Sequence, residues 1–283
     1  SPVLYTGNKP GGQLTITTDV ENFPGFPEGV QGPELVELFR QQAARFDTEL
    51  NYENITKVDF TGPIHKVWNE SGEEIQAHTV IISTGADAKW LGVPGEERLM
   101  NRGVSACAVC DGFFFRGMEV AVVGGGDSAA EEATYLAKLC PKVHLIVRKD
   151  YLRASKIMAK RVMDNPKIQV HFNTETVEIL GEDEVTGVKF YNNATKEEFE
   201  LPIKGFFVAI GHKPNTDIFS DFIEMKDGGY IKTIQGTVKT NVEGVFAAGD
   251  VQDDVYRQAI TSAGTGCMAA LEAEKYLINK GIE

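Results

Sequence analysis

The stretch that decides the fold reads Val120-Ala121-Val122-Val123-Gly124-Gly125-Gly126-Asp127-Ser128-Ala129. A strand-sized apolar run enters a G-x-G-x-x-A turn, and a helical pattern follows from 127 to 139. In such a turn Gly124 permits the tight bend, Gly126 lets the backbone approach a pyrophosphate, and Ala129 allows close packing of helix on strand. N–H groups at the start of the helix favour an anion. We therefore predict a dinucleotide site here, with Asp127 and Ser128 beside the phosphates.

The next strand decides which nicotinamide cofactor is expected. An NAD site places Asp or Glu at the end of that strand, for the ribose 2′-hydroxyl. Here the strand ends at Val147-Arg148-Lys149, and Arg153 follows. These cations could form a solvated helix face, but the missing acid and their position favour a clamp on the 2′-phosphate of NADPH. Arg148 is the best candidate because a guanidinium grips phosphate with two parallel hydrogen bonds. Ile210 and Gly211, at the end of a later buried strand, are assigned to the same site.

Around this stretch strands and helices alternate, which is typical of α/β architecture. Strands are expected at 2–5 (a short buried one), 55–60, 64–68, 79–83, 119–123, 143–147, 168–172, 205–211 and 244–250. Helices are expected from Gly32-Pro33 onward and at 127–139, 155–163 and 257–277, with a β-meander over 175–202. Two linker-like stretches bracket the middle of the chain. We therefore expect a domain at 88–215 inserted into another domain made of 1–87 and 216–283.

Bulk composition narrows the class of protein. The chain has 283 residues and 42% hydrophobic content, which suits two domains with separate cores. Its apolar runs are strand-sized and fall short of the roughly 20 residues that span a bilayer, and no secretory signal is evident. A net charge of −13 repels nucleic acid and anionic membranes. We therefore expect a cytoplasmic protein with neither nucleic acid nor membrane as partner.

The four cysteines include one close pair, in Cys107-Ala108-Val109-Cys110-Asp111. Three interpretations stand open. A zinc site needs two more ligands, and the five histidines are scattered, so no metal is expected. Two structural cysteines are the second interpretation. The third, a redox pair, is favoured because the spacing lets two sulfurs bond across one turn, and Asp111 stands ready as proton donor and acceptor. Cys140 and Cys267 lie in helix-like contexts and are expected to be inert core thiols.

A late motif suggests a second cofactor. Residues 240–250 form a buried strand ending in Gly249-Asp250, at the strand end where α/β sheets bind ligands. An aspartate there suits a polyol such as the ribityl chain of a flavin. Arg257-Gln258-Ala259 then opens the last helix, whose N–H groups favour negative charge on a reduced flavin ring.

Together these motifs resemble the low-molecular-weight thioredoxin reductases. The resemblance rests on Cys107-Ala108-Val109-Cys110-Asp111-Gly112, on the glycine turn with Ala130-Glu131-Glu132-Ala133 behind it, on Gly244–Asp250, on Tyr256–Gly264, and on the early Gly11-Gly12-Gln13-Leu14 and Val20–Gly25. It runs along the whole chain, in family order. It implies two Rossmann-like (three-layer ββα) nucleotide-binding domains, with the NADPH domain inserted into a discontinuous FAD domain, in a homodimer.

The resemblance also implies roles for residues. Cys110 would face the flavin and Cys107 would attack the disulfide of thioredoxin, while Asp111 handles protons. Phe113 and Phe114 resemble the apolar patch that docks thioredoxin; three consecutive phenylalanines, Phe113 to Phe115, cannot all point into one core. The residues assigned to FAD are Gly11, Gly12, Gln13, Leu14, Asn22, Thr84, Gly85, Ala86, Gly249, Asp250, Arg257, Gln258 and Ala259.

Two departures from the family leave alternatives open. Lys149 stands where the family usually has a second arginine, which bears on the preference for NADPH over NADH. The family also begins with a strand, a G-x-G-x-x-G turn and a helix that hold the FAD pyrophosphate, whereas Pro2–Gly7 resembles the strand after them, so we expect a fragment. The alternatives are a flavin-poor fragment, an NADPH-binding scaffold, or a reductase for another disulfide protein. Relatives serving peroxide reduction carry an extra domain, and ferredoxin-dependent relatives lack the cysteine pair.

Overall fold

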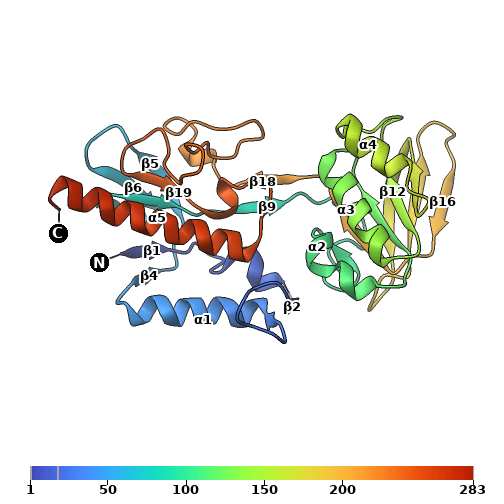
Figure 1. Ribbon diagram of the computed structural model, residues 1–283, viewed down its shortest axis with the longest axis horizontal. Coiled ribbons are helices and arrows are strands. Elements are labelled where there is room, and N and C mark those ends of the chain that lie inside the picture. The colour runs from blue at the N-terminus through green and yellow to red at the C-terminus, as the bar shows by residue number, and fades with distance from the viewer. Residues whose placement is uncertain (1, 18, 283) are drawn as a thin grey trace. The chain divides into compact units, whose positions relative to one another are not determined.

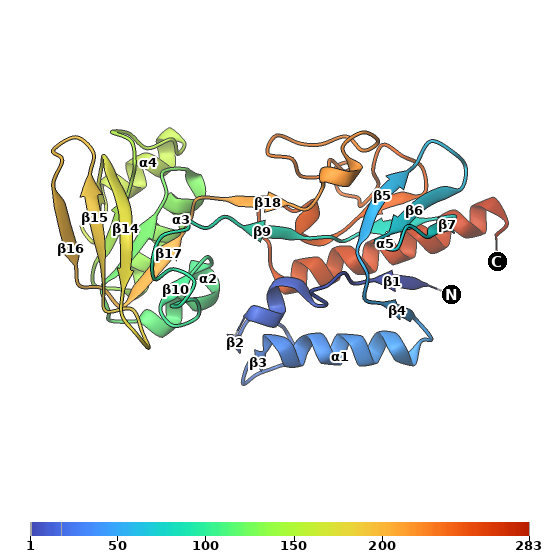
Figure 2. The ribbon, with the colours of Figure 1, turned by 180° about the vertical axis from the view of Figure 1, so that it is seen from behind.

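The computed structural model describes residues 2–17 and 19–282 and divides into two compact units (Figures 1 and 2). The insert unit is Ala88–His212, and the flanking unit comprises the residues up to Asp87 together with those from Lys213 onward. The chain passes from one unit to the other in β9 (Ala86–Ala88) and returns in β18 (His212–Pro214). These two strands form a two-stranded sheet of their own.

The insert unit is built on a five-stranded parallel sheet in the order β10-β17-β11-β12-β13. Its strands are β10 (Val104–Ser105), β11 (Val120–Val123), β12 (Val143–Ile146), β13 (Ile168–His171) and β17 (Gly205–Val208). The antiparallel meander consists of β14 (Thr174–Leu180), β15 (Gly187–Asn192) and β16 (Glu198–Leu201). The helices are α2 (Ala108–Asp111), η2 (Gly112–Phe115), α3 (Asp127–Leu139) and α4 (Lys156–Met163).

Side-chain alternation along β11 separates the three layers of this unit. Val120 and Val122 belong to the core shared with Ala129 and Ala133 of α3. Ala121 and Val123 point to the opposite face, because successive side chains of a strand alternate, and join the core that includes Phe190 of the meander. The unit is therefore a ββα sandwich, with helices on one face of the sheet and the meander on the other (Figure 2).

The flanking unit contains two separate parallel strand pairs. β1 (Val3–Tyr5) pairs with β4 (Glu49–Asn51), and β8 (Val80–Ile82) pairs with β19 (Val245–Ala247). A meander of β5 (Ile55–Asp59), β6 (His65–Asn69) and β7 (Glu74–Ala77) accompanies them. The helices are α1 (Gly32–Arg45) and α5 (Ala259–Lys280). Short elements are η1 (Gly12–Ile16), β2 (Asp19–Val20), β3 (Val30–Gln31), η3 (Asp217–Phe219) and η4 (Gly249–Val251).

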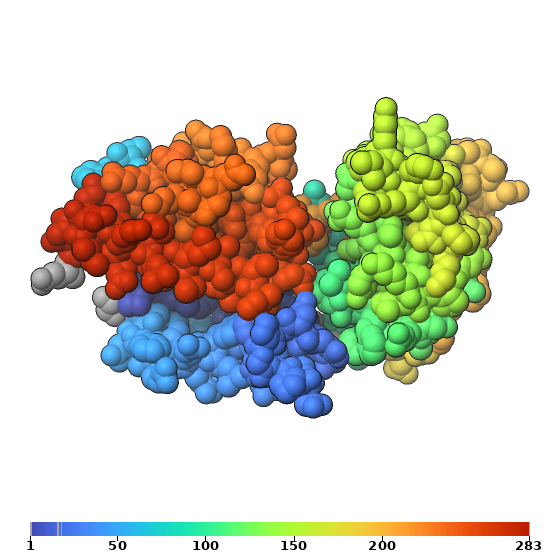
Figure 3. All heavy atoms as spheres, viewed as in Figure 1, coloured from blue at the N-terminus to red at the C-terminus, as the bar shows by residue number. Residues whose placement is uncertain are grey.

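The same alternation organises the flanking unit around β19. Val245 and Ala247 pack in a core with Val58 of β5, whereas Phe246 packs with Ala269 and Ala273 of α5. This unit therefore also has meander, parallel strands and helix in three layers. A hollow is visible between α1 and α5, with the first residues of the chain at its bottom (Figure 3).

Three expectations about local structure need correction. The strand at the start of the chain is present, but it is not buried, since Val3 and Leu4 are 46% and 41% exposed. Cys267 is exposed rather than in the core, because it lies on the face of α5 opposite Ala269 and Ala273. The strand expected over 244–250 ends at Ala247, because Gly249 has φ 75° and turns the chain into η4. Cys140 is buried as expected.

Other elements follow the sequence closely. Helix α3 spans Asp127–Leu139 as predicted, and α4 begins one residue late because Ser155 serves as its N-cap. The short strands β4 and β7 were missed, since each has only one or two apolar residues. Within residues 2–17 and 19–282, the structure has no helix with the length and apolar character needed to cross a membrane.

Candidate redox centre and nucleotide sites

A disulfide joins Cys107 and Cys110, whose Cα atoms are 5.3 Å apart. The pair lies directly after β10, with Cys107 as the N-cap of the short helix α2. The backbone N–H of Cys110 donates to Sγ of Cys107 at 3.2 Å. A hydrogen bond to sulfur stabilises its anionic form, so this geometry favours thiolate at Cys107 once the disulfide is opened.

Asp111 follows the pair and is held from two sides. Its backbone N–H donates to the carbonyl of Cys107 at 3.1 Å, which closes the turn of α2. Its carboxylate accepts a hydrogen bond from the hydroxyl of Ser105 at 2.5 Å. The sequence placed Asp111 beside the sulfurs but missed Ser105. A hydroxyl residue two positions before the first cysteine was the available signal.

The three consecutive phenylalanines do not share one environment: two are exposed and the third packs inside the unit. Phe113 and Phe114 are 56% and 44% exposed, whereas Phe115 packs edge-on against Phe207 of β17 with ring centroids 5.4 Å apart. The guanidinium of Arg116 lies 5.7 Å from the ring centroid of Phe113. The insert unit therefore presents two aromatic rings and a cation within a few residues of the disulfide.

The glycine turn has the strict geometry that its sequence predicts. Gly124 has φ 149°, and a Cβ there would lie 2.3 Å from the carbonyl oxygen of Ala209 and 2.7 Å from Cβ of Ala129. A Cβ on Gly126, by contrast, would meet no atom within 4 Å. Gly126 thus borders open space in front of the N–H groups of Asp127 and Ser128, which is room that a pyrophosphate fits.

The basic segment after β12 is tied to that turn by its backbone. The N–H groups of Arg153 and Ala154 donate to the carbonyl of Gly125 at 2.6 and 3.1 Å, and the N–H of Ser155 donates to Oδ1 of Asp127 at 2.9 Å. Arg148, Lys149 and Arg153 are all exposed. These contacts hold the basic segment next to the glycine turn. Ile210 and Gly211 end the strand region after β17, and Gly211 adopts φ 103°.

Several of the residues assigned to FAD meet in the flanking unit, although they are distant in sequence. The amide of Gln13 donates to the carbonyl of Ala86 at 2.7 Å, and the amide of Asn22 donates to Oε1 of Gln258 at 2.9 Å. Thr84 donates to the carbonyl of Asn215 at 2.6 Å. Gly11, Gly12 and Gly85 all have positive φ. Among the described residues, this unit has no glycine turn between a parallel strand and an α-helix.

Asp250 is the charged group of this second site. It lies just after β19 and accepts a hydrogen bond from the Ser262 hydroxyl at 3.0 Å. Burial raises the pKa of its carboxyl above the usual value. The preceding N–H, on Gly249, donates to Oγ1 of Thr265 at 2.9 Å. A half-buried carboxylate in this position fits a ligand that supplies hydroxyl donors, such as a polyol chain.

Asp253, which the sequence reading missed, shapes the loop that leads into α5. Its carboxylate accepts the N–H groups of Val255, Tyr256 and Arg257 at 2.8–3.1 Å. Arg257 adopts φ 49°, and Gln258 caps α5 together with Thr261. The sequence offered one signal for this loop: aspartate commonly accepts hydrogen bonds from the backbone N–H groups of the residues that follow it in a turn.

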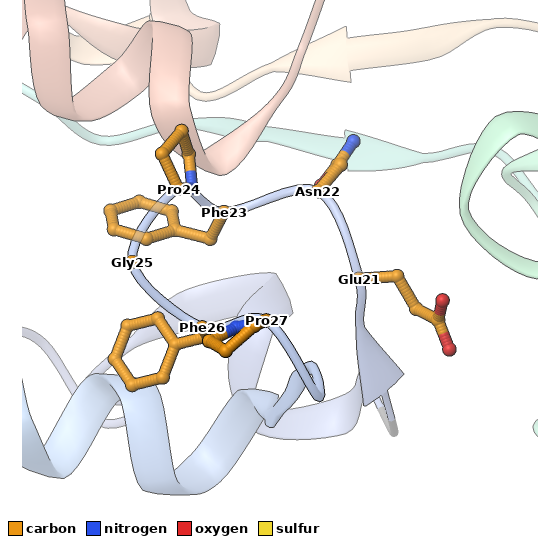
Figure 4. A pocket seen from close by; sticks show the side chains of 7 residues that line it. All are labelled: Glu21, Asn22, Phe23, Pro24, Gly25, Phe26 and Pro27. Atoms are coloured by element: carbon orange, nitrogen blue, oxygen red, sulfur yellow. The ribbon is translucent and has the colours of Figure 1, made fainter.

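The loop 21–27 borders a shallow open pocket (Figure 4). Phe23 and Phe26 lie on one side of the loop and Glu21 on the other, while Asn22 points toward α5. The ring of Phe23 packs against that of Phe39 of α1, with centroids 5.6 Å apart. The packing fixes the loop, so Asn22 is held in place to meet Gln258.

Comparison with known proteins finds relatives that match nearly the whole chain. The sequence pattern of the family described as pyridine nucleotide-disulphide oxidoreductase matches residues 2–266. A thioredoxin reductase of Rickettsia conorii is 54% identical over 279 residues, covering 98% of this chain and 90% of the relative. Thioredoxin reductase 1 of Saccharomyces cerevisiae is 50% identical over 287 residues, with the same coverage. The solved structure of thioredoxin reductase from Giardia duodenalis matches with a TM-score of 0.94 at 40% identity, covering 98% of this chain and 91% of that one.

Proposed function

This chain belongs to the pyridine nucleotide-disulphide oxidoreductase family, and we propose that it is an NADPH-dependent thioredoxin reductase. The observation that best supports this proposal is the disulfide Cys107–Cys110, which Asp111 directly follows. The disulfide lies in the same unit as the glycine turn. The cofactors are FAD and NADPH, which when bound pass two electrons toward this disulfide. The two-domain, Rossmann-like fold of the relatives is the fold of this chain.

The chain's own residues divide the chemistry. Opening the disulfide consumes two electrons and two protons. The N–H of Cys110 supports thiolate on Cys107, so Cys107 is the sulfur that attacks thioredoxin and Cys110 is the sulfur that is reduced first and later resolves the mixed disulfide. Asp111 gives and takes the proton at these sulfurs.

The nucleotide sites are proposed in the two units separately. In the insert unit, Gly124, Gly126, Asp127 and Ser128 hold the NADPH pyrophosphate, and Arg148 with its neighbouring cations holds the 2′-phosphate. In the flanking unit, Asp250 binds the ribityl chain of FAD, and the start of α5 lies at the flavin ring. The remaining assigned residues line these two sites. Support comes from the open space at Gly126 and from the half-buried carboxylate of Asp250, whose pKa desolvation raises.

Partner and location complete the proposal. Thioredoxin docks at Phe113 and Phe114, whose rings are exposed near the disulfide. The chain forms a homodimer through the flanking unit, where large apolar side chains such as Tyr256 and Phe46 are 68% and 63% exposed. We propose the cytoplasm as its location. Disulfides in that compartment are usually transient and catalytic, as Cys107–Cys110 would be, because thiols there are kept reduced. Light scattering in solution tests the dimer, and a monomer would contradict it.

The function is tested with NADPH oxidation in the presence of added FAD, thioredoxin and a disulfide dye. Dye reduction should depend on thioredoxin and should be lost in Cys107→Ser and Cys110→Ser. The exposed Cys267→Ser serves as the matched control and should keep full turnover. A Cys107→Ser variant that still reduces thioredoxin would show that Cys107 is not the attacking sulfur and would contradict the mechanism. Turnover indifferent to thioredoxin would point to another acceptor, and a protein that gains no flavin absorbance would contradict the FAD site.

A further inference from the structure

A buried hydroxyl joins the disulfide to its neighbouring acid. Ser105 is the last residue of β10, pairs with Phe207 of β17, and is 7% exposed. Its Oγ accepts the backbone N–H of Cys107 at 3.0 Å and donates to Oδ2 of Asp111 at 2.5 Å. One atom therefore contacts both the backbone of the first cysteine and the carboxylate that follows the second.

The direction of these hydrogen bonds follows from what a serine can offer. A hydroxyl has one hydrogen to donate and two lone pairs to accept with. The lone pairs face the N–H of Cys107, so the hydrogen is free for an acceptor. The carbonyl of Cys107 is 3.4 Å from Oγ, whereas the carboxylate of Asp111 is 2.5 Å away. The closer and charged acceptor takes the hydrogen, because charge-assisted hydrogen bonds are the stronger ones.

The position of Ser105 is itself rigid. It sits at the edge of the five-stranded sheet and its backbone is fixed by pairing with β17. A hydroxyl on a paired strand is a firmer support than one on a loop, because the pairing of β10 with β17 restrains the backbone of Ser105. Asp111 lies at the end of a helix of only four residues. The sheet therefore supplies, through Ser105, the rigidity that this short helix lacks.

We propose that Ser105 is a positioning residue for the thiol–disulfide step, acting through Asp111. When a thiolate attacks the disulfide, the Cys107–Cys110 bond breaks, one new S–S bond forms, and the departing sulfur keeps the electron pair. The proton that neutralises this sulfur comes from the carboxyl of Asp111, and water replaces it. Ser105 stabilises the carboxylate left behind and holds it in one orientation. The inference deepens the proposed function and rests on it.

Other ionisable groups near Asp111 must be kept constant in any test. Helix α3 packs on this region, since a Cβ on Gly112 would meet the side chains of Leu136, Tyr135 and Leu139. Glu132 shares that face of α3 by helical spacing. Arg116 follows the phenylalanines directly after η2, and the two sulfurs of the pair lie on the same short turn as Asp111. All of them stay unchanged in the variants below.

The test measures opening of the disulfide by dithiothreitol, which needs neither flavin nor nicotinamide. The rate is followed by thiol trapping and mass spectrometry from pH 5 to 9. The Asp111-dependent part is the difference between the wild type and Asp111→Asn. In Ser105→Ala we expect the pH midpoint of this part to rise by about one unit, because the carboxylate loses a hydrogen bond that stabilised it. Ser105→Thr, which keeps the hydroxyl, should restore the midpoint.

Two further variants separate positioning from mere structure. Thr174→Val removes another buried hydroxyl of the insert unit, one that donates to the carbonyl of Phe172 at 2.8 Å, and should leave the midpoint unchanged. In the Asp111→Asn background, Ser105→Ala should have no further effect on rate, since it acts through the missing carboxylate. A midpoint equal to the wild type, or an equal loss of rate in both backgrounds, would overturn the proposal. If the enzyme did not reduce thioredoxin but the variants showed the expected shift of the pH midpoint, the proposed function would be wrong and the role of Ser105 would stand.

Discussion

At the scale of single residues, the two outer glycines of the turn have opposite tasks. Gly124→Ala should destabilise the insert unit by about 3 kcal/mol, because its Cβ collides with backbone at a φ unfavourable for alanine. Gly126→Ala should keep the fold, since its Cβ meets nothing, yet should weaken NADPH binding by filling the space of the pyrophosphate. Thermal unfolding and NADPH titration of both variants check this. Equal effects of the two variants on stability would contradict it.

At the same scale, we expect Arg148 to set the preference for NADPH over NADH. Arg148→Ala should weaken NADPH binding by tenfold or more, since a charge-assisted hydrogen bond contributes about 1.5–3 kcal/mol. Binding of NADH, which lacks the 2′-phosphate, should hardly change. The matched control is Arg161→Ala, in the same basic segment, where the guanidinium donates to the sulfur of Met158 at 3.7 Å. The measurement is the ratio of KM values for the two nucleotides, and an unchanged ratio in Arg148→Ala would refute the clamp.

At the scale of elements, we expect the consecutive phenylalanines of η2 to serve two purposes, docking of thioredoxin and packing of the core. Phe113→Ala and Phe114→Ala should leave stability within about 0.5 kcal/mol, because both rings are exposed, but should raise the KM for thioredoxin about tenfold. Phe115→Ala should instead cost about 2–4 kcal/mol of stability, because its ring packs on Phe207. Opening of the Cys107–Cys110 disulfide by dithiothreitol, which needs no thioredoxin, serves as the control and should proceed at the wild-type rate. A KM for thioredoxin unchanged in both exposed variants would place the docking surface elsewhere.

Neighbouring strands β12 and β13 carry a histidine pair, in which His144 is buried and His171 is half-buried. Nδ1 of His144 lies 3.0 Å from Nε2 of His171, and Nε2 of His144 lies 3.3 Å from Glu119. Burial first, and then the neighbouring His144, lowers the pKa of His171 to about 4. Burial also lowers the pKa of His144, although Glu119 opposes the shift. The folded pair is therefore neutral at pH values where the unfolded chain is already protonated.

This pair predicts how stability depends on pH. As the pH falls below about 6.5, the unfolded state binds protons that the folded state excludes, so stability declines down to about pH 4. The loss from His171 is at most on the order of 3 kcal/mol. Urea unfolding at pH 7, 6, 5 and 4 should show a steeper decline in the wild type than in His171→Gln. Parallel declines would mean that the pair does not contribute.

At the scale of the whole molecule, the insert unit has what it needs to fold alone. It is one continuous segment, 88–212, with helix-side and meander-side cores of its own. Its ends leave through β9 and β18, which pair with each other. Expressed separately, it should unfold in one cooperative transition and bind NADPH, but it should not oxidise NADPH with thioredoxin. Circular dichroism on heating measures the transition, and Gly124→Ala should lower its midpoint. A gradual, non-cooperative melt would contradict independent folding.

What the sequence determined by itself is local. The glycine turn, helix α3 and the cysteine pair with Asp111 were predictable because each depends on residues within one or two turns of the chain. Short apolar runs also predicted β11, β12, β13 and β17 of the parallel sheet in the insert unit, whereas the two-residue strand β10 is too short to give such a run. The resemblance to a known family extended these predictions to the flavin-side residues.

Only the tertiary structure decided the contacts between distant segments. Asn22 and Gln258 are 236 residues apart, and Gln13 meets Ala86 through a backbone carbonyl that no side-chain pattern reveals. The exposure of Cys267, Val3 and Leu4 likewise depends on which faces other elements cover. Ser105 lies close to the pair in sequence, but its hydrogen bond to Asp111 depends on how β10 and α2 are folded together. Local pattern specifies elements and turns, whereas the partner of a polar side chain is fixed only when the chain has packed.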